Sequence, residues 1–143
     1  MKPETAAFLR KSRELLAKAQ DLVDAHHWPD EAGRAAYLAG FHAAQAFLFD
    51  STGKVYKSHK GVQKEFLRVT KDDPRFAMEL RAFLGRAYNL KAIADYETVP
   101  GSQVSAESAH DAIQAAHRFV ECVASLILAN GRTSRAPDAE PKL

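Results

Sequence analysis

Apolar residues recur at three- and four-residue steps along most of the chain, which is the spacing of one helix face. Five segments carry this period: 4–27, 31–50, 59–70, 74–95 and the stretch between Ser105 and Gly131. No alternation typical of strands competes with it, and the connections are short, which favours antiparallel packing of successive helices. The pattern therefore predicts an all-α fold, an up-and-down bundle of four to five helices.

The second helix is expected to lie at the centre of the bundle. Small residues and aromatic residues alternate around its whole circumference, so it lacks the polar face of a surface helix. Small side chains also let neighbouring helices approach closely. The other helices should pack around it.

Capping and turn-forming residues indicate where the helices should begin and end. Asp30 is predicted to cap the second helix, and Ser58 and Ser105 the third and fifth. Asp72-Asp73-Pro74 should turn the chain into the fourth, and Gly131 should end the fifth. The tail is polar with two prolines, so the expected organisation is a bundle over 1–130 and a disordered segment over 131–143.

Positive charge is concentrated in the middle of the chain. The formal net charge is only +2, but residues 54–91 hold 10 Lys and Arg against 4 Asp and Glu, or +6. This region is where an anionic partner would bind, and the alternative is a solvated basic face.

The chain offers little for metal or membrane chemistry. The one cysteine, Cys122, lies in an apolar helix and should be buried and inert, and the adjacent His26 and His27 face different ways on a helix. No metal site and no cofactor are expected. The N-terminus lacks a signal-peptide pattern, and no apolar run approaches the roughly 20 residues of a membrane span. We therefore expect a cytoplasmic protein.

Two neighbouring features form the candidate site. Leu84, Tyr88, Lys91 and Asp95 follow one another along a single face of the fourth helix. The first turn of the third helix, Ser58-His59-Lys60-Gly61, has free backbone N–H groups and the positive end of the helix dipole, which can hold a phosphate. The candidate nucleic-acid or phosphate-binding residues are Ser58, His59, Lys60, Arg86 and Lys91. The alternatives are a weak Lys91–Asp95 surface ion pair and an ordinary serine cap.

Three other histidines have structural interpretations. His42 is favoured as a hydrogen-bonded core or interface residue, with a catalytic role as the alternative, because a histidine in apolar surroundings can titrate near neutral pH. His110 and His117 are seven residues apart and share a helix face, which suits a subunit contact.

Three segments together resemble the HEPN family, in particular the branch of prokaryotic HEPN proteins often encoded beside a minimal nucleotidyltransferase. The second helix from Ala35-Ala36-Tyr37 to Gly53 is similar to the central helix of that branch. Ser58-His59-Lys60-Gly61-Val62 resembles the start of its third helix. Tyr88-Asn89-Leu90-Lys91 to Asp95-Tyr96 resembles its fourth-helix signature, a basic residue followed by Asp-Tyr. Order and spacing agree over about residues 5–128.

The resemblance implies a helical bundle, usually a homodimer, that associates with RNA or nucleotides and with a nucleotidyltransferase partner. Active HEPN toxins are metal-independent ribonucleases whose hallmark is an arginine followed after four to six residues by a histidine. No arginine here has a histidine at that spacing, and Arg34 and His42 are separated by seven residues. Lys91, Asp95 and Tyr96 stand at the corresponding place, so the candidate catalytic residues are Lys91, Asp95 and His59.

Three functions remain open on these grounds. The first is a toxin–antitoxin-type module that binds RNA, a nucleotide or a nucleotidyltransferase without cleaving RNA. The second is a metal-independent endoribonuclease toxin with a divergent Lys91/Asp95 site. The third is a non-catalytic oligomerisation subunit.

Overall fold

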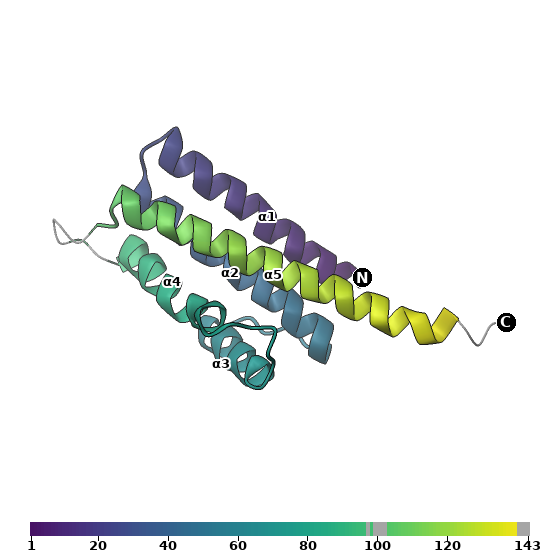
Figure 1. Ribbon diagram of the computed structural model, residues 1–143. Coiled ribbons are helices and arrows are strands. Elements are labelled where there is room, and N and C mark those ends of the chain that lie inside the picture. The colour runs from purple at the N-terminus through teal and green to yellow at the C-terminus, as the bar shows by residue number, and fades with distance from the viewer. Residues whose placement is uncertain (97, 99–102, 140–143) are drawn as a thin grey trace.

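A computed structural model describes residues 1–96, 98 and 103–139 of the chain, with side chains up to residue 131. Five helices make up the bundle and no strand occurs among the described residues, which confirms the predicted all-α fold (Figure 1). The helices are α1 (Pro3–Asp24), α2 (Pro29–Thr52), α3 (His59–Thr70), α4 (Met78–Tyr96) and α5 (Ala106–Ala139).

α2 is the central helix, as predicted, and packs against each of the other four. Its most extensive contact is with α1, followed by α5 and α4. Fourteen of its 24 residues are buried, because small side chains let neighbours approach from several directions.

Two glycines fix how α2 lies against α4. A Cβ on Gly40 would lie 2.2 Å from the Phe83 ring, and one on Gly33 would lie 3.3 Å from Leu90. The glycines are seven residues apart on α2, as are their partners on α4, and the pairing runs in opposite directions. The two helices are therefore antiparallel and in close contact, and this register determines which polar side chains meet.

Two of the three predicted helix caps agree with the structure. Ser58 and Ser105 do cap their helices, since each hydroxyl accepts a hydrogen bond from a backbone N–H three residues later. Asp30 does not cap α2, because Pro29 occupies its first turn and Trp28 the cap position. The Asp30 carboxylate instead accepts a hydrogen bond of 2.6 Å from the backbone N–H of Val104, just before α5.

The start of α4 and the end of α5 were predicted wrongly. α4 begins at Met78 rather than at 74, because Asp73 accepts a backbone hydrogen bond from Arg75 and pairs with its guanidinium, which holds a turn there. α5 continues through Gly131 to Ala139, since one glycine costs a helix only about 1 kcal/mol. Residues 140–143 of the expected tail lie outside the described residues, and the boundary at 130 stays a prediction.

The bundle interior explains the apolar character of α5. Over Ala106–Gly131 this helix is long and apolar enough to cross a membrane by length and composition alone, contrary to the sequence expectation. Its inward residues Ile113, Phe119 and Val120 are buried against the other helices, which is the same composition that a core helix needs.

Candidate functional site

Four aromatic rings meet where α2, α3 and α4 converge. Tyr37 and Phe41 lie one turn apart on α2, and they surround the His59 ring together with Tyr88 of α4. The ring centroids of these three partners lie 4.8–5.6 Å from that of His59. His59 is thus held in a largely apolar setting at the first residue of α3.

The start of α3 is shaped by its serine cap. The Ser58 hydroxyl accepts a hydrogen bond of 2.9 Å from the Gly61 N–H. A Cβ on Gly61 would lie 2.7 Å from that oxygen, so a glycine suits the cap at this position. His59 and Lys60 follow the cap directly, next to the positive end of the helix dipole.

A chain of hydrogen bonds orients the imidazole. The Gln63 amide lies 3.5 Å from the Tyr37 hydroxyl, which lies 2.9 Å from Nδ1 of His59. Burial raises the pKa of Tyr37, so the phenol keeps its proton at neutral pH. The direction of the Tyr37–His59 hydrogen bond follows the imidazole tautomer: the phenol donates to Nδ1 when the ring proton lies on Nε2, and it accepts when that proton lies on Nδ1.

Burial also keeps the imidazole neutral. The His59 pKa is lowered from its ordinary value, first by burial and then by the positive charge of Lys91, which Asp95 partly offsets. Within the described residues Nε2 has no hydrogen-bond partner. This nitrogen of His59 is therefore open to a ligand.

Two cations share one carboxylate beside this ring. Arg34 Nε and Lys91 Nζ each lie 2.8 Å from an oxygen of Asp95, so α2 and α4 are joined by an ion pair that spans 61 residues. The Lys91 side chain is only 9% exposed, against 23% for Asp95 and 40% for Arg34. We call these three residues the ion triad.

The ion triad holds each group in its charged form. The hydrogen bond that the Lys91 ammonium donates to Asp95, assisted by Arg34, lowers the pKa of Asp95, and the same hydrogen bond raises the pKa of Lys91. The Lys91 ammonium also lies 5.8 Å from the Tyr88 ring centroid and 5.3 Å from that of Tyr96. Since His59 and Lys91 both contact the Tyr88 ring, the triad adjoins the imidazole.

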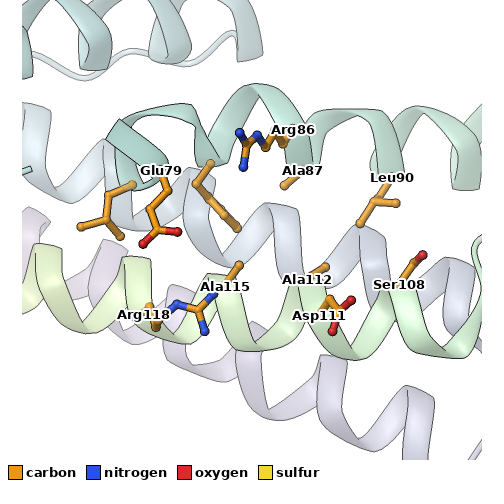
Figure 2. A pocket seen from close by; sticks show the side chains of 11 residues that line it. Glu79, Arg86, Ala87, Leu90, Ser108, Asp111, Ala112, Ala115 and Arg118 are labelled. Atoms are coloured by element: carbon orange, nitrogen blue, oxygen red, sulfur yellow. The ribbon is translucent and has the colours of Figure 1, made fainter. Parts of the chain in front are cut away.

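The predicted site residues divide into two groups. Folding brings His59, Lys91 and Asp95 together, with Ser58 and an exposed Lys60 on the same helix turn. Arg86 lies elsewhere, in a groove between α4 and α5 (Figure 2). It faces away from the triad because it is five residues before Lys91, which is nearly one and a half helical turns.

The remaining histidines have structural surroundings. His42 Nδ1 lies 2.7 Å from the Gln45 side-chain oxygen, and the Gln45 amide donates a hydrogen bond to the backbone carbonyl of Tyr56. Burial lowers the pKa of His42. His110 lies 3.9 Å from Asp24, and His117 is exposed. Among the residues with described positions, no three His, Cys, Asp or Glu side chains gather as a metal ion would require.

Sequence reasoning missed Tyr37, Gln63 and the contribution of Arg34. Arg34 and Tyr37 are three residues apart on one face of α2, and this polar pair within the otherwise small and apolar run 32–41 was the available signal. Their partners on α3 and α4 depend on the helix register and are not visible in a single sequence.

Comparison with known proteins agrees with this architecture. The family model described as the HEPN domain matches residues 5–126, which cover helices α1 to α4 and most of α5. None of the curated proteins is significantly similar to the chain. The match extends over much more than half of the sequence and over the helices that build the site. The chain therefore belongs to the HEPN domain family.

Proposed function

We propose that this HEPN protein is a toxin–antitoxin-type component that binds RNA or a nucleotide without cleaving RNA efficiently. The binding site consists of the ion triad and of His59 with the surrounding rings of Tyr37, Phe41 and Tyr88, which we call the His59 cluster. The proposal rests on one observation: the Asp95 carboxylate pairs with both Arg34 and Lys91, beside a neutral His59.

The charge balance at the site favours a phosphate. Arg34 and Lys91 carry two positive charges against the one negative charge of Asp95, which leaves a net +1. The open Nε2 of His59 and the backbone N–H groups in the first turn of α3 add hydrogen-bonding groups, and Lys60 adds an exposed positive charge. These groups match the oxygen acceptors and negative charge of a phosphodiester or a nucleotide.

The same pairing disfavours general acid–base catalysis. A carboxylate whose pKa is lowered is a weak proton acceptor near neutral pH, and a lysine whose pKa is raised does not release its proton. Together with the missing Arg-x4-6-His spacing, this supports binding rather than turnover.

A divergent ribonuclease is the second candidate. One observation favours it: a histidine with an open Nε2 adjoins Lys91, so a phosphate held by Lys91 would lie near an imidazole. In that mechanism Lys91 holds the phosphate and His59 or Asp95 moves the proton.

The family suggests the partners of this chain. HEPN proteins of the branch described above are often encoded beside a minimal nucleotidyltransferase, so we include such an enzyme as a proposed partner, in the cytoplasm. Co-expression should yield a stable complex by size exclusion, and separate elution of the two proteins would remove this part of the proposal.

The direct test is RNA binding and cleavage by the purified protein in EDTA at several salt concentrations. We expect intact RNA, with affinity that falls as salt rises. Lys91→Met should reduce both the affinity and the salt slope, whereas Lys64→Met, an exposed lysine of α3 outside the cluster, should have less effect.

Three other outcomes decide against the proposal. Cleavage that is lost in Lys91→Met and in His59→Gln would establish the ribonuclease. Binding that Lys91→Met and Lys64→Met weaken equally would indicate a general basic surface. If the protein binds neither RNA nor a nucleotide at low salt, the result would favour the non-catalytic oligomerisation subunit.

A further inference from the structure

One exposed aromatic ring lies beside the ion triad. Tyr96 is the last residue of α4 and is 70% exposed, so most of its surface is in contact with water. Of the other Phe, Tyr and Trp side chains, Trp28 alone is exposed, and the rest are buried or half-buried. Single apolar side chains are common on protein surfaces, so the position of this ring is more informative than its exposure.

The Lys91 ammonium holds the Tyr96 ring at the edge of the triad. Its Nζ lies 5.3 Å from the centroid of that ring and 2.8 Å from an oxygen of Asp95. A cation is attracted to the face of an aromatic ring, and Lys91 is itself held in place by Asp95 and by the Tyr88 ring. The ring of Tyr96 is therefore positioned, although it is exposed.

Arg34 presents hydrogen-bond donors from the other oxygen of the same carboxylate. Its Nε donates to Asp95, and among the residues with described side chains its two terminal nitrogens have no hydrogen-bond partner. The bond to Asp95 fixes the plane of the guanidinium, which is 40% exposed. Arg34 thus offers a pre-oriented donor group that suits the oxygens of a phosphate.

We infer that Tyr96 is a stacking platform for a nucleobase whose phosphate is held by Arg34 and by the open Nε2 of His59. Because this role rests on the proposed function, it defines the ligand of that same site more closely. A nucleotide carries its base and its phosphate on one ribose, and the triad places an aromatic ring and phosphate-binding donors around one carboxylate. Proteins that hold single-stranded nucleic acids use aromatic side chains in this way.

The platform selects an unpaired base. A base within a duplex is stacked between its neighbours, so its face is not available to Tyr96. A base in a single strand or in a free nucleotide is available. The ligand is therefore a nucleotide with an exposed base next to its phosphate, and duplex nucleic acid lacks that group.

Two ligands that differ only in the base test the platform. AMP and ribose 5-phosphate carry the same sugar and phosphate, and AMP adds adenine. In NMR titrations the wild type should bind AMP at least about tenfold more tightly than ribose 5-phosphate. The adenine protons should shift upfield on binding, because the base lies over an aromatic ring.

Tyr96→Leu separates stacking from a purely structural role. Leucine still covers the Lys91 side chain but has no aromatic face. The variant should bind AMP about as weakly as ribose 5-phosphate, while its affinity for ribose 5-phosphate stays that of the wild type. Tyr96→Phe should retain the preference for AMP. If Tyr96 only covers Lys91, Tyr96→Leu would weaken both ligands equally, and this result would overturn the inference.

Trp28→Leu is the matched control, because Trp28 is the other exposed aromatic side chain and its ring stacks on His26. It should bind AMP as the wild type does. An equal loss of AMP affinity in Trp28→Leu and Tyr96→Leu would decide against a specific platform. Circular dichroism should show that each variant is folded as the wild type.

A short oligoadenylate and its duplex with the complementary strand distinguish the two sources of the base. Tyr96→Leu should weaken binding of the single strand and leave binding of the duplex unchanged. A single strand that binds more tightly than AMP identifies RNA as the source, and equal affinity identifies the free nucleotide. Either result supports the platform when Tyr96→Leu weakens the binding.

Failure of the platform can be told apart from failure of the proposed function. Equal affinity of the wild type for AMP and ribose 5-phosphate, with both weakened in Lys91→Met, would overturn the platform and leave the phosphate site in place. Absence of binding for AMP, ribose 5-phosphate and both forms of the oligonucleotide would overturn the platform and the proposed function together.

Discussion

The Tyr37 hydroxyl contacts Nδ1 of His59 at 2.9 Å and so connects a fully buried residue of α2 to the first residue of α3. It occupies Nδ1 and leaves the outward Nε2 of the imidazole open to a ligand. The chemistry that His59 can offer is therefore determined by a residue that no ligand could touch.

Tyr37→Phe should change the tautomer of His59 without displacing its ring. Nitrogen chemical shifts of the imidazole should report mainly the Nε2–H form in the wild type and a mixture of tautomers in the variant. The unfolding free energy should fall by about 1 kcal/mol, since one buried hydrogen bond is lost. A wild-type ring protonated on Nδ1 would contradict the expectation that Tyr37 donates the hydrogen bond.

Asp95→Asn should make the free energy of unfolding less dependent on pH under acidic conditions. The folded pKa of Asp95 is lowered, so the unfolded chain binds its proton more readily. The resulting stability is present above about pH 4 and is lost as the pH falls through the folded pKa. At pH 7 we expect a loss of about 1–2 kcal/mol, between an exposed and a buried ion pair.

Urea denaturation at pH 7 and at low pH measures this difference. Asp21→Asn is the control, because Asp21 is exposed and its only charged partner among the described residues is a histidine. Equal acid sensitivity of the wild type and Asp95→Asn would show that the triad contributes no linked stability.

Gly40→Ala should be strongly destabilising, because the new Cβ would lie 2.2 Å from the Phe83 ring in the α2–α4 contact. Overpacking of this kind costs about 1–3 kcal/mol. Gly85→Ala is the matched control on α4, where an added Cβ meets nothing within 4 Å. Since alanine favours helices, the control should be stabilising by up to about 1 kcal/mol in thermal unfolding. Similar effects at both positions would contradict the close contact.

Asp30→Ala should loosen the junction before α5, because it removes the acceptor for the Val104 N–H at 2.6 Å. We expect a loss of about 1 kcal/mol and faster amide hydrogen exchange at Val104. If Asp30 acted instead as a cap of α2, the faster exchange would occur in the first turn of α2.

Local rules predicted most of the helices and little of the site. The apolar period located all five helices, and Ser58 caps α3 because its hydrogen bond lies within one turn. The Lys91–Asp95 pair followed from its spacing for the same reason. Asp30 failed as a predicted cap because a distant residue, Val104, competes for its carboxylate. The roles of Arg34 and Tyr37 require the α2–α4 register, which two glycines determine through tertiary contact.

The largest helix–helix contact in the bundle, between α1 and α2, joins neighbours in the sequence. Chain connectivity therefore favours an early α1–α2 hairpin during folding, since closing a short connection loses little entropy. α5 must then dock on α2 across a long stretch of chain before the apolar core is complete. Pulsed hydrogen exchange should show protection in α1 and α2 before α4 and α5, and simultaneous protection throughout would indicate a single cooperative step.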